Sequence, residues 1–411
     1  MNWIEKMIAE QCPNGVKKVK LGDVIKNLRT GLNPRVHFKL NTTDAQCYYI
    51  TVRELKGFDI KVDEKTDRIN ETARIRINER SKLQINDILF SGTGTIGRTA
   101  IVKEAPTNWN IKEGVYAITP DTKLINPYYF IYVLHSSEIE DQISNKAGGS
   151  TVKSIPMAEL KKLEIPLPSL SIQEEIVSVL DKFSELIEKT DEEIALRQKQ
   201  YEYYREKLLT FEEGEVEEYL SFGNDFHLKA RIGWQGLTKQ EYKTSGEYLL
   251  ITGTDFTNAH TIDFEHCVFV EKERYEQDKN IQIRPEDVLI TKDGTLGKVA
   301  YIENIPLPCT LNGGVFVVRN KTNKIIPKFL MYYLTSYNFT SWMDKNHTSG
   351  SIMHLTQKLL CKFLIPVVKI SRQQEIVTIL DKFETLISKL KEERELRQKQ
   401  YEYYREKLLT F

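Results

Sequence analysis

The feature that most constrains this chain is a long internal repeat. The 16 residues LRQKQYEYYREKLLTF occur at Leu196–Phe211 and again, unchanged, at Leu396–Phe411, an offset of 200 residues. The same offset aligns residues 171–195 with residues 371–395. A repeat of this length indicates two similar halves that each contain the same structural element.

Each copy of the repeat predicts one long α-helix. Apolar and aromatic side chains recur in alternating steps of three and four residues, which is typical of a coiled-coil seam. Neither proline nor glycine interrupts residues 171–211 or 371–411. About forty residues at 1.5 Å each give a rod of roughly 60 Å. The predicted seam contains Ile176, Phe183, Leu186, Tyr201, Tyr204 and Leu208 in the first helix, and Ile376, Phe383, Leu386, Tyr401, Tyr404 and Leu408 in the second.

This apolar stripe is narrow, so each helix needs a partner, and the nearest candidate is its own twin. Thr190 and Arg197 interrupt the stripe of the first helix with polar side chains. The tyrosines of YEYYREK could instead stack on nucleic-acid bases, but Tyr201 and Tyr204 fall on the seam, which favours packing. A coiled coil with a purely structural role remains an alternative at this point.

Two globular domains are predicted between and before the helices. We expect residues 1–170 and 213–370 to form the domains, and residues 171–212 and 371–411 to form the helices. The first domain contains short β-rich runs such as DILF and GVYAIT, followed by the helical NPYYFIYVL, so its class is α+β. Asp87–Ala100 aligns with Asp287–Ala300, whereas most of the two domains has diverged. Similar helices that carry dissimilar domains suggest one scaffold with two specificities.

Charge and cysteine content exclude several classes of protein. Lys plus Arg equal Asp plus Glu at 58 each, so the chain is no polycation, although residues 16–170 carry 24 basic against 18 acidic residues, an excess of six. The five cysteines are scattered and none has CxxC spacing, which argues against a disulfide framework or zinc site. The chain has neither an evident signal peptide nor a run of about 20 apolar residues, so we expect a cytoplasmic protein without a membrane partner.

Several motifs suggest catalysis but fail on their context. Gly92–Gly97 matches GxGxxG, yet a strand-like run follows it where a dinucleotide fold needs a helix, so a tight turn within a β-structure is the better interpretation. NPYY at Asn126–Tyr129 resembles the NPPY motif of amino-methyltransferases, but it lacks the second proline and reads as a helix start capped by Asn126. His260 and His266 lack the spacing of a zinc site. We therefore predict no catalytic residues and no metal.

Polar loops are better candidates for recognition. TGLNPRVHFK contains Arg35 and directly follows Arg29, and AGGSTVK contains Ser150, Thr151 and Lys153. Small residues let a backbone approach a phosphate, and neighbouring Arg or Lys side chains can reach base edges. Ordinary solvated loops look much the same, so this signal is weak on its own.

The order of these elements resembles the specificity subunit of type I restriction–modification enzymes over the full chain. The resemblance rests on the two 200-residue halves, the junctions IPLPSLSIQEEIV and IPVVKISRQQEIV, the GTxG[RK] turns and the two long helices. It implies two target recognition domains and two spacer helices that form an antiparallel coiled coil with pseudo-twofold symmetry. The second junction lacks the second proline of the first.

The resemblance also implies DNA-facing residues. The loop before the last short helix of each domain would face DNA, with Ser150, Thr151 and Lys153 in the first domain and Ser349, Gly350 and Ser351 in the second. The glycine turns, to which we assign a structural role first, place Arg98 and Lys298 as further candidates, and Arg231 is another in the second domain.

The function implied by the resemblance is recognition of a bipartite, asymmetric site in double-stranded DNA by a non-catalytic subunit. Its partners would be two adenine methyltransferase subunits and the restriction subunits. The chain itself would hold no cofactor, and S-adenosylmethionine would bind to the methyltransferase. A fused methyltransferase is the enzymatic alternative, and binding of S-adenosylmethionine by the chain alone would distinguish it.

Overall fold

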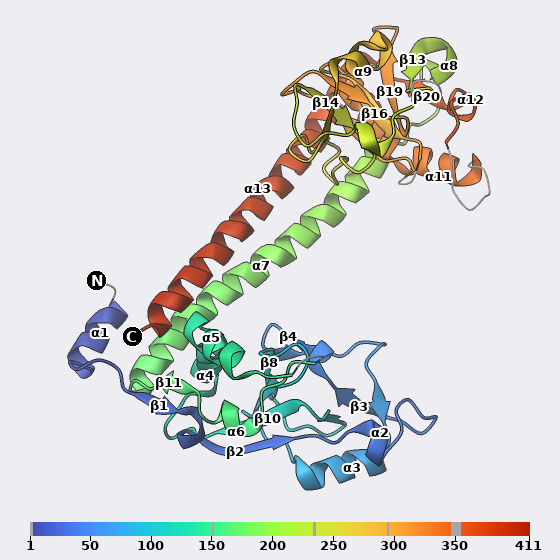
Figure 1. The fold of residues 1–411 in the computed structure, drawn as a ribbon. Helices are drawn as coiled ribbons and strands as arrows, with labels where there is room; N and C mark the ends of the chain where they lie inside the picture. The colour runs from blue at the N-terminus through green and yellow to red at the C-terminus, as the bar shows by residue number, and fades with distance from the viewer. Residues whose placement is uncertain (1–2, 150–151, 233–235, 294–295, 347–354) are drawn as a thin grey trace. The chain divides into compact units, whose positions relative to one another are not determined.

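The chain folds into two compact units that divide each long helix between them (Figure 1). The computed structural model describes residues 3–149, 152–232, 236–293, 296–346 and 355–411. Unit 1 combines Met1–Thr190 with Glu393–Phe411, and unit 2 is Asp191–Glu392. The long helices are α7 (Leu170–Leu208) and α13 (Ile370–Leu409). Each unit therefore holds one globular domain, part of α7 and part of α13, whereas the four-part division predicted from the sequence remains a prediction about separable domains.

The globular domain of unit 1 is built on a four-stranded antiparallel sheet in the order β2-β10-β7-β8. A three-stranded sheet, β6-β3-β9, lies beside it, with β3 parallel to β9. The larger sheet comprises β2 (Ile25–Thr30), β10 (Val115–Pro120), β7 (Ile88–Ser91) and β8 (Thr99–Ile101), and the smaller one β6 (Arg68–Ile69), β3 (Cys47–Ile50) and β9 (Trp109–Ile111). The remaining strands form two pairs, β1 (Lys18–Lys20) with β11 (Glu164–Pro166) and β4 (Leu55–Lys56) with β5 (Asp59–Ile60).

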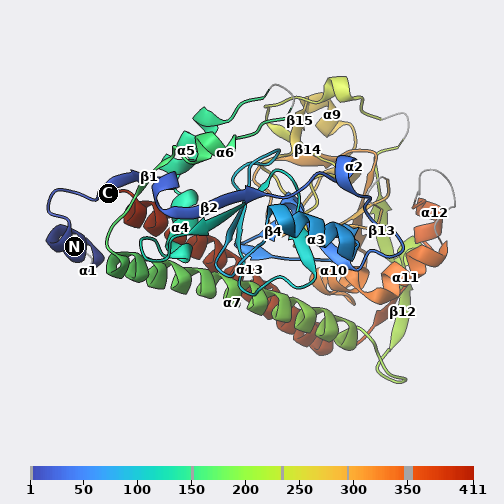
Figure 2. The ribbon, with the colours of Figure 1, turned by 90° about the horizontal axis from the view of Figure 1, so that it is seen from below.

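Burial of β7 on both faces explains why its sequence is apolar without alternation. Ile88 and Phe90 contribute to the core that also contains α4 and α7, while Leu89 contributes to a second core with residues of the three-stranded sheet. The helices of this domain are α1 (Trp3–Gln11), α2 (Pro34–His37), α3 (Glu71–Arg80), α4 (Pro127–Leu134), α5 (Ser137–Lys146) and α6 (Met157–Leu160). Figures 1 and 2 both show α1 close to the C-terminus, where Ile4 and Leu409 share the first of these cores.

Two local predictions for this domain are confirmed. Helix α4 begins with Pro127, and the side chain of Asn126 accepts hydrogen bonds from the backbone N–H groups of Tyr128 and Tyr129. NPYY is therefore a helix start, as proline at the first helical position favours. The glycine-rich run Gly92–Gly97 connects strands β7 and β8, so it is a turn within a sheet and precedes no helix.

Unit 2 repeats this architecture. Its four-stranded sheet has the order β13-β19-β16-β17, and its three-stranded sheet has the order β15-β14-β18, again with one parallel pair. The strands are β12 (Glu218–Ser221), β13 (Phe226–Lys229), β14 (Tyr248–Ile251), β15 (Val268–Val270), β16 (Val288–Thr291), β17 (Val299–Tyr301), β18 (Cys309–Leu311), β19 (Val315–Asn320) and β20 (Leu364–Val367). The helices are α8 (Phe222–Asp225), α9 (Lys272–Glu276), α10 (Pro327–Thr335), α11 (Tyr337–Asn346) and α12 (Gln357–Leu360). The α+β class and the internal repeat predicted from the sequence are thus confirmed.

The two helices run antiparallel within each unit. In unit 1 the rings of Phe183 and Tyr404 stack with centroids 5.2 Å apart, and Arg397 Nη1 donates to Thr190 Oγ1 at 2.6 Å. Residues later in α7 therefore contact residues earlier in α13, as in an antiparallel coiled coil. In unit 2 the rings of Tyr204 and Phe383 stack in the same way at 5.6 Å.

The predicted seam residues divide into two groups. Ile176, Ile376, Tyr201, Tyr401 and Leu408 are buried, whereas Phe183, Phe383, Tyr204, Tyr404 and Leu208 are half-buried. The prediction is wrong for Leu186 and Leu386, which are 44% and 38% exposed. The next residue along each helix faces the core instead, because Ile387 is 7% exposed within the core of unit 2 and Ile187 packs against the core of unit 1.

Candidate nucleic-acid interface

The turn between β7 and β8 is held by a compact set of hydrogen bonds. Ser91 Oγ accepts from the backbone N–H of Arg98 at 2.8 Å, and the Gly97 N–H donates to the Ser91 carbonyl at 3.0 Å. Gly97 has a φ of +93°, a conformation that favours glycine because it carries no Cβ. The turn thus presents the exposed Arg98 side chain immediately after a fixed backbone.

This turn lies against the loop before α6. The Gly94 N–H donates to the Lys153 carbonyl at 2.9 Å, and the Ile155 N–H donates to the Gly92 carbonyl at 2.9 Å. The structure therefore brings together two loops that the sequence marked separately. Lys153 is exposed, while Ser150 and Thr151 lie outside the described residues.

A cleft of about 510 Å³ is formed where the two loops meet α5. Arg98, Lys153, His135 and Glu140 contribute its charged and titratable side chains. His135 Nε2 lies 2.8 Å from Thr99 Oγ1, and burial, with a smaller effect from Arg405, lowers its pKa to about 4. The imidazole is therefore neutral at physiological pH, and the cleft carries two cations and one carboxylate. Sequence reasoning missed His135, which ends the apolar helix α4, and Glu140, which lies on the polar helix α5, because neither belongs to a recognisable motif.

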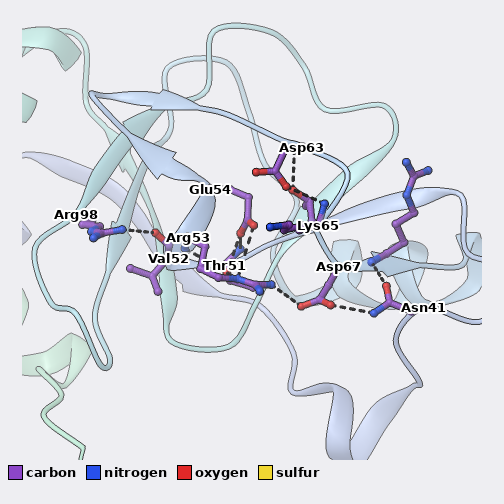
Figure 3. A network of polar contacts seen from close by, with 11 residues as sticks. Asn41, Thr51, Val52, Arg53, Glu54, Asp63, Lys65, Asp67 and Arg98 are labelled. Atoms are coloured by element: carbon purple, nitrogen blue, oxygen red, sulfur yellow. Dashed lines mark hydrogen bonds and ion pairs between the residues drawn. The ribbon is translucent and has the colours of Figure 1, made fainter. Parts of the chain in front are cut away.

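Arg98 also neighbours an ordered polar loop. Its Nη1 donates to the Val52 carbonyl at 3.3 Å, and Thr51 and Glu54 form a capping box around the same loop (Figure 3). Arg53 pairs with Asp67 at 2.7 Å and remains exposed. The guanidinium of Arg98 thus has one long contact to the protein and faces solvent.

Arg29 occupies a structural position. Its Nη2 lies 2.6 Å from the carboxylate of the fully buried Asp87 and also donates to Thr119 Oγ1 at 2.7 Å. Only 11% of the Arg29 side chain is exposed. Burial raises the pKa of Asp87, opposed by its hydrogen bonds and by the charge of Arg29. The Arg29 side chain ties the edge strand β2 to β10 and to the start of β7, and this geometry opposes a contact with DNA.

Arg231 is buried in the second domain. It is 2% exposed, and it donates to the Leu311 carbonyl and the Gln277 side chain at 2.9 Å each. Desolvation lowers the pKa of its guanidinium. Among the candidate arginines, Arg35 is by contrast exposed on α2, so it is available to a ligand whereas Arg231 is enclosed.

The second domain repeats the turn. Lys298 is exposed, and its backbone N–H donates to Thr291 Oγ1 at 2.9 Å. Gly297 has a φ of +77°, in the same left-handed region as Gly97. The other candidates of this domain, Ser349, Gly350 and Ser351, lie outside the described residues.

Neither histidine that the sequence marked has metal-site geometry. His260 Nδ1 contacts the Val299 carbonyl at 3.3 Å, and His266 pairs with Asp263. Over the described ranges, the structure contains no group of three His, Cys, Asp or Glu side chains suited to a metal ion. No helix in the described part of the chain is both long and apolar enough to cross a bilayer.

Comparison with known protein families decides the classification. The model of the type I restriction modification DNA specificity domain matches twice, at residues 13–196 and 235–398, once in each half of the repeat. The chain belongs to this family of type I restriction–modification specificity subunits. The resemblance of repeat, junctions and turns is therefore confirmed, as is the prediction of a non-catalytic subunit that recognises DNA sequence.

Relatives of this family show how far the similarity extends. The EcoR124I/EcoR124II specificity subunit of Escherichia coli is 36% identical over 266 residues, which cover 61% of this chain and 63% of that relative. The putative MjaX specificity subunit of Methanocaldococcus jannaschii is 25% identical over 397 residues, covering 92% of this chain and 88% of the relative.

Solved structures of the family share the fold. The S subunit from M. genitalium superposes with a TM-score of 0.55 at 17% identity, covering 97% of this chain and 96% of that one. A chain from a study of complex assembly and conformational transition in the type I R-M system reaches a TM-score of 0.62, also at 17% identity, covering 97% and 98%.

Proposed function

We propose that this specificity subunit reads a bipartite, asymmetric site in double-stranded DNA, with each globular domain acting as a target recognition domain for one half-site. The observation that carries the proposal is the duplicated scaffold with diverged domains. The two four-stranded sheets have the same strand order, yet the domain sequences between the shared turns and helices differ. Two copies of one scaffold with different loops suit two different half-sites.

The chain also acts as a scaffold in this proposal. Two adenine methyltransferase subunits bind it and supply S-adenosylmethionine, and the restriction subunits join the complete complex in the cytoplasm. The repeat supports this stoichiometry, because Leu196–Phe211 and Leu396–Phe411 offer the same residues twice. Exposed side chains are repeated along with the seam, since Tyr203 and Tyr403 are 61% and 60% exposed.

The cleft beside Arg98 and Lys153 is the proposed DNA-facing surface of the first domain. Its exposed cations and close glycine backbone suit a polyanion, because phosphate contacts come from Arg, Lys and backbone N–H groups. The net charge of zero for the whole chain limits the contribution of long-range attraction, so the partner subunits would supply further phosphate contacts.

Methylation mapping of a genome tests this proposal. Cells that express the chain with the methyltransferase of its own system should carry adenine methylation in a split motif with two different halves. Cells that lack only this chain should lose that motif. A continuous or palindromic motif, or an unchanged methylome without the chain, would contradict the proposal.

A further inference from the structure

The two domains remain similar in sequence at one turn, which joins β7 to β8 in the first domain and β16 to β17 in the second. Asp87–Ala100 and Asp287–Ala300 align through DILFSGTGTIGRTA and DVLITKDGTLGKVA. Under the proposed function, on which this inference rests, the two domains face different bases. The chemical feature common to any two half-sites is the sugar–phosphate backbone, which carries no direct sequence information.

The described parts of the two turns have nearly the same hydrogen bonds. The backbone N–H of Arg98 donates to Ser91 Oγ at 2.8 Å, and that of Lys298 donates to Thr291 Oγ1 at 2.9 Å. The return bonds also match, because the Ser91 and Thr291 N–H groups donate to the carbonyls of Arg98 and Lys298 at 2.8 and 2.9 Å. Each domain therefore presents residue 98 or 298 from an equivalent backbone.

The structural needs of the turn explain its glycine and hydroxyl residues but not its cation. Gly97 and Gly297 both have positive φ, and the hydroxyls of Ser91 and Thr291 accept the bonds that close the turn. The side chain at the next position is exposed in both domains. Arg98 makes one long contact of 3.3 Å, to a backbone carbonyl, and the ammonium of Lys298 forms no ion pair with any residue that the structure describes.

The surroundings of Arg98 favour an anion. Lys153 adds a second exposed cation in the same cleft, held there through the hydrogen bond from Gly94 to its carbonyl. Glu140 opposes them with one carboxylate, while His135 contributes no charge near neutral pH. The remaining net charge is positive, which suits one phosphate.

We propose that Arg98 and Lys298 are the phosphate anchors of the two recognition domains and that they position each domain on the DNA backbone without reading bases. Arginine and lysine both serve this purpose, because a phosphate accepts either a forked guanidinium or a point charge. Base recognition then falls to loops that differ between the domains, such as the one with the exposed Arg35.

The test measures DNA affinity against salt for the full chain purified with its methyltransferase subunits. Two duplexes are used, one with the methylated motif and one without it. Arg98→Ala should weaken binding to both duplexes by the same factor and reduce the salt slope by about one. Its affinity deficit should therefore shrink about 3.5-fold between roughly 50 and 200 mM salt. Lys298→Ala should behave alike, and Arg98→Lys should retain the wild-type slope.

Lys123→Ala, which removes an exposed lysine elsewhere in the first domain, is the matched control and should change neither affinity nor slope. The inference is overturned if Arg98→Ala alters the methylated bases of one half-motif, since Arg98 would then read bases. Unchanged affinity and slope would overturn it too, as would a lower melting temperature that Arg98→Lys does not restore. If the wild-type complex binds neither duplex, the proposed function fails as well, whereas normal wild-type binding with unaffected variants refutes this inference alone.

Discussion

The stacked pair Tyr204–Phe383 allows a quantitative test of the helix seam in unit 2. Their ring centroids are 5.6 Å apart at an interplanar angle of 24°, and Tyr204 is half-buried. Truncating a fully buried aromatic residue costs about 3–5 kcal/mol, so half-burial reduces the expected loss to about 2 kcal/mol. The lost ring stacking contributes about 0.5–1 kcal/mol more. Tyr204→Ala should therefore lower the free energy of unfolding by about 2.5–3 kcal/mol.

Tyr203 is the matched control, because it is the same residue type one position away on α7 and is 61% exposed. Tyr203→Ala should cost less than about 0.5 kcal/mol. Urea denaturation followed by circular dichroism at 222 nm gives both values, and a double-mutant cycle with Phe383→Ala isolates the ring pair. Equal losses for the two tyrosines, or a coupling near zero with Phe383, would refute the assignment of Tyr204 to the seam.

Two further predictions concern buried polar groups. Arg231→Ala should destabilise unit 2 by about 2–4 kcal/mol, because it leaves buried acceptors such as the Leu311 carbonyl unpaired. As a control, Arg35→Ala should cost less than about 0.5 kcal/mol. Equal losses of stability for the two variants in calorimetry would contradict the structural role of Arg231. Burial lowers the pKa of His135 from 6.5 to about 4, so between these pH values the unfolded chain binds the proton more readily than the folded protein does. The resulting loss of stability is absent above pH 6.5 and grows as the pH falls toward 4. The free energy of unfolding should therefore fall from pH 7 to pH 5 by about 1–2 kcal/mol more in the wild type than in His135→Gln. An identical pH dependence of the two proteins would disprove this.

The long helices could be predicted from the sequence because their information is local and repeated. The three-and-four spacing predicts the seam positions of Ile176, Phe183 and their counterparts. The second copy of the helix shows the same spacing, which supports the prediction independently. The prediction is wrong for Leu186 and Leu386, because the adjacent Ile187 and Ile387 face the core at this level. Steps of three and four residues fit either position, so spacing alone does not decide between two neighbouring apolar residues.

The buried ion pairs of the two domains show what spacing cannot reveal. Asp87 pairs with Arg29 from β2, whereas Asp287 pairs with Arg319 from β19 at 2.6 Å. The aligned aspartates are visible in the repeat, but their cations come from different strands, so no alignment predicts the pairs. The sequence around Arg29 therefore suggests a DNA contact, because it does not reveal that Asp87 pairs with this arginine.

The most direct test of the account replaces one recognition domain and reads the methylome. Residues 16–170 would be exchanged for the corresponding domain of another specificity subunit with a known split motif, and the cells would also express the methyltransferase. The account predicts that one half of the methylated motif changes to that of the donor while the other half is retained. A motif that changes in both halves, or in neither, would contradict the claim that each globular domain reads its own half-site.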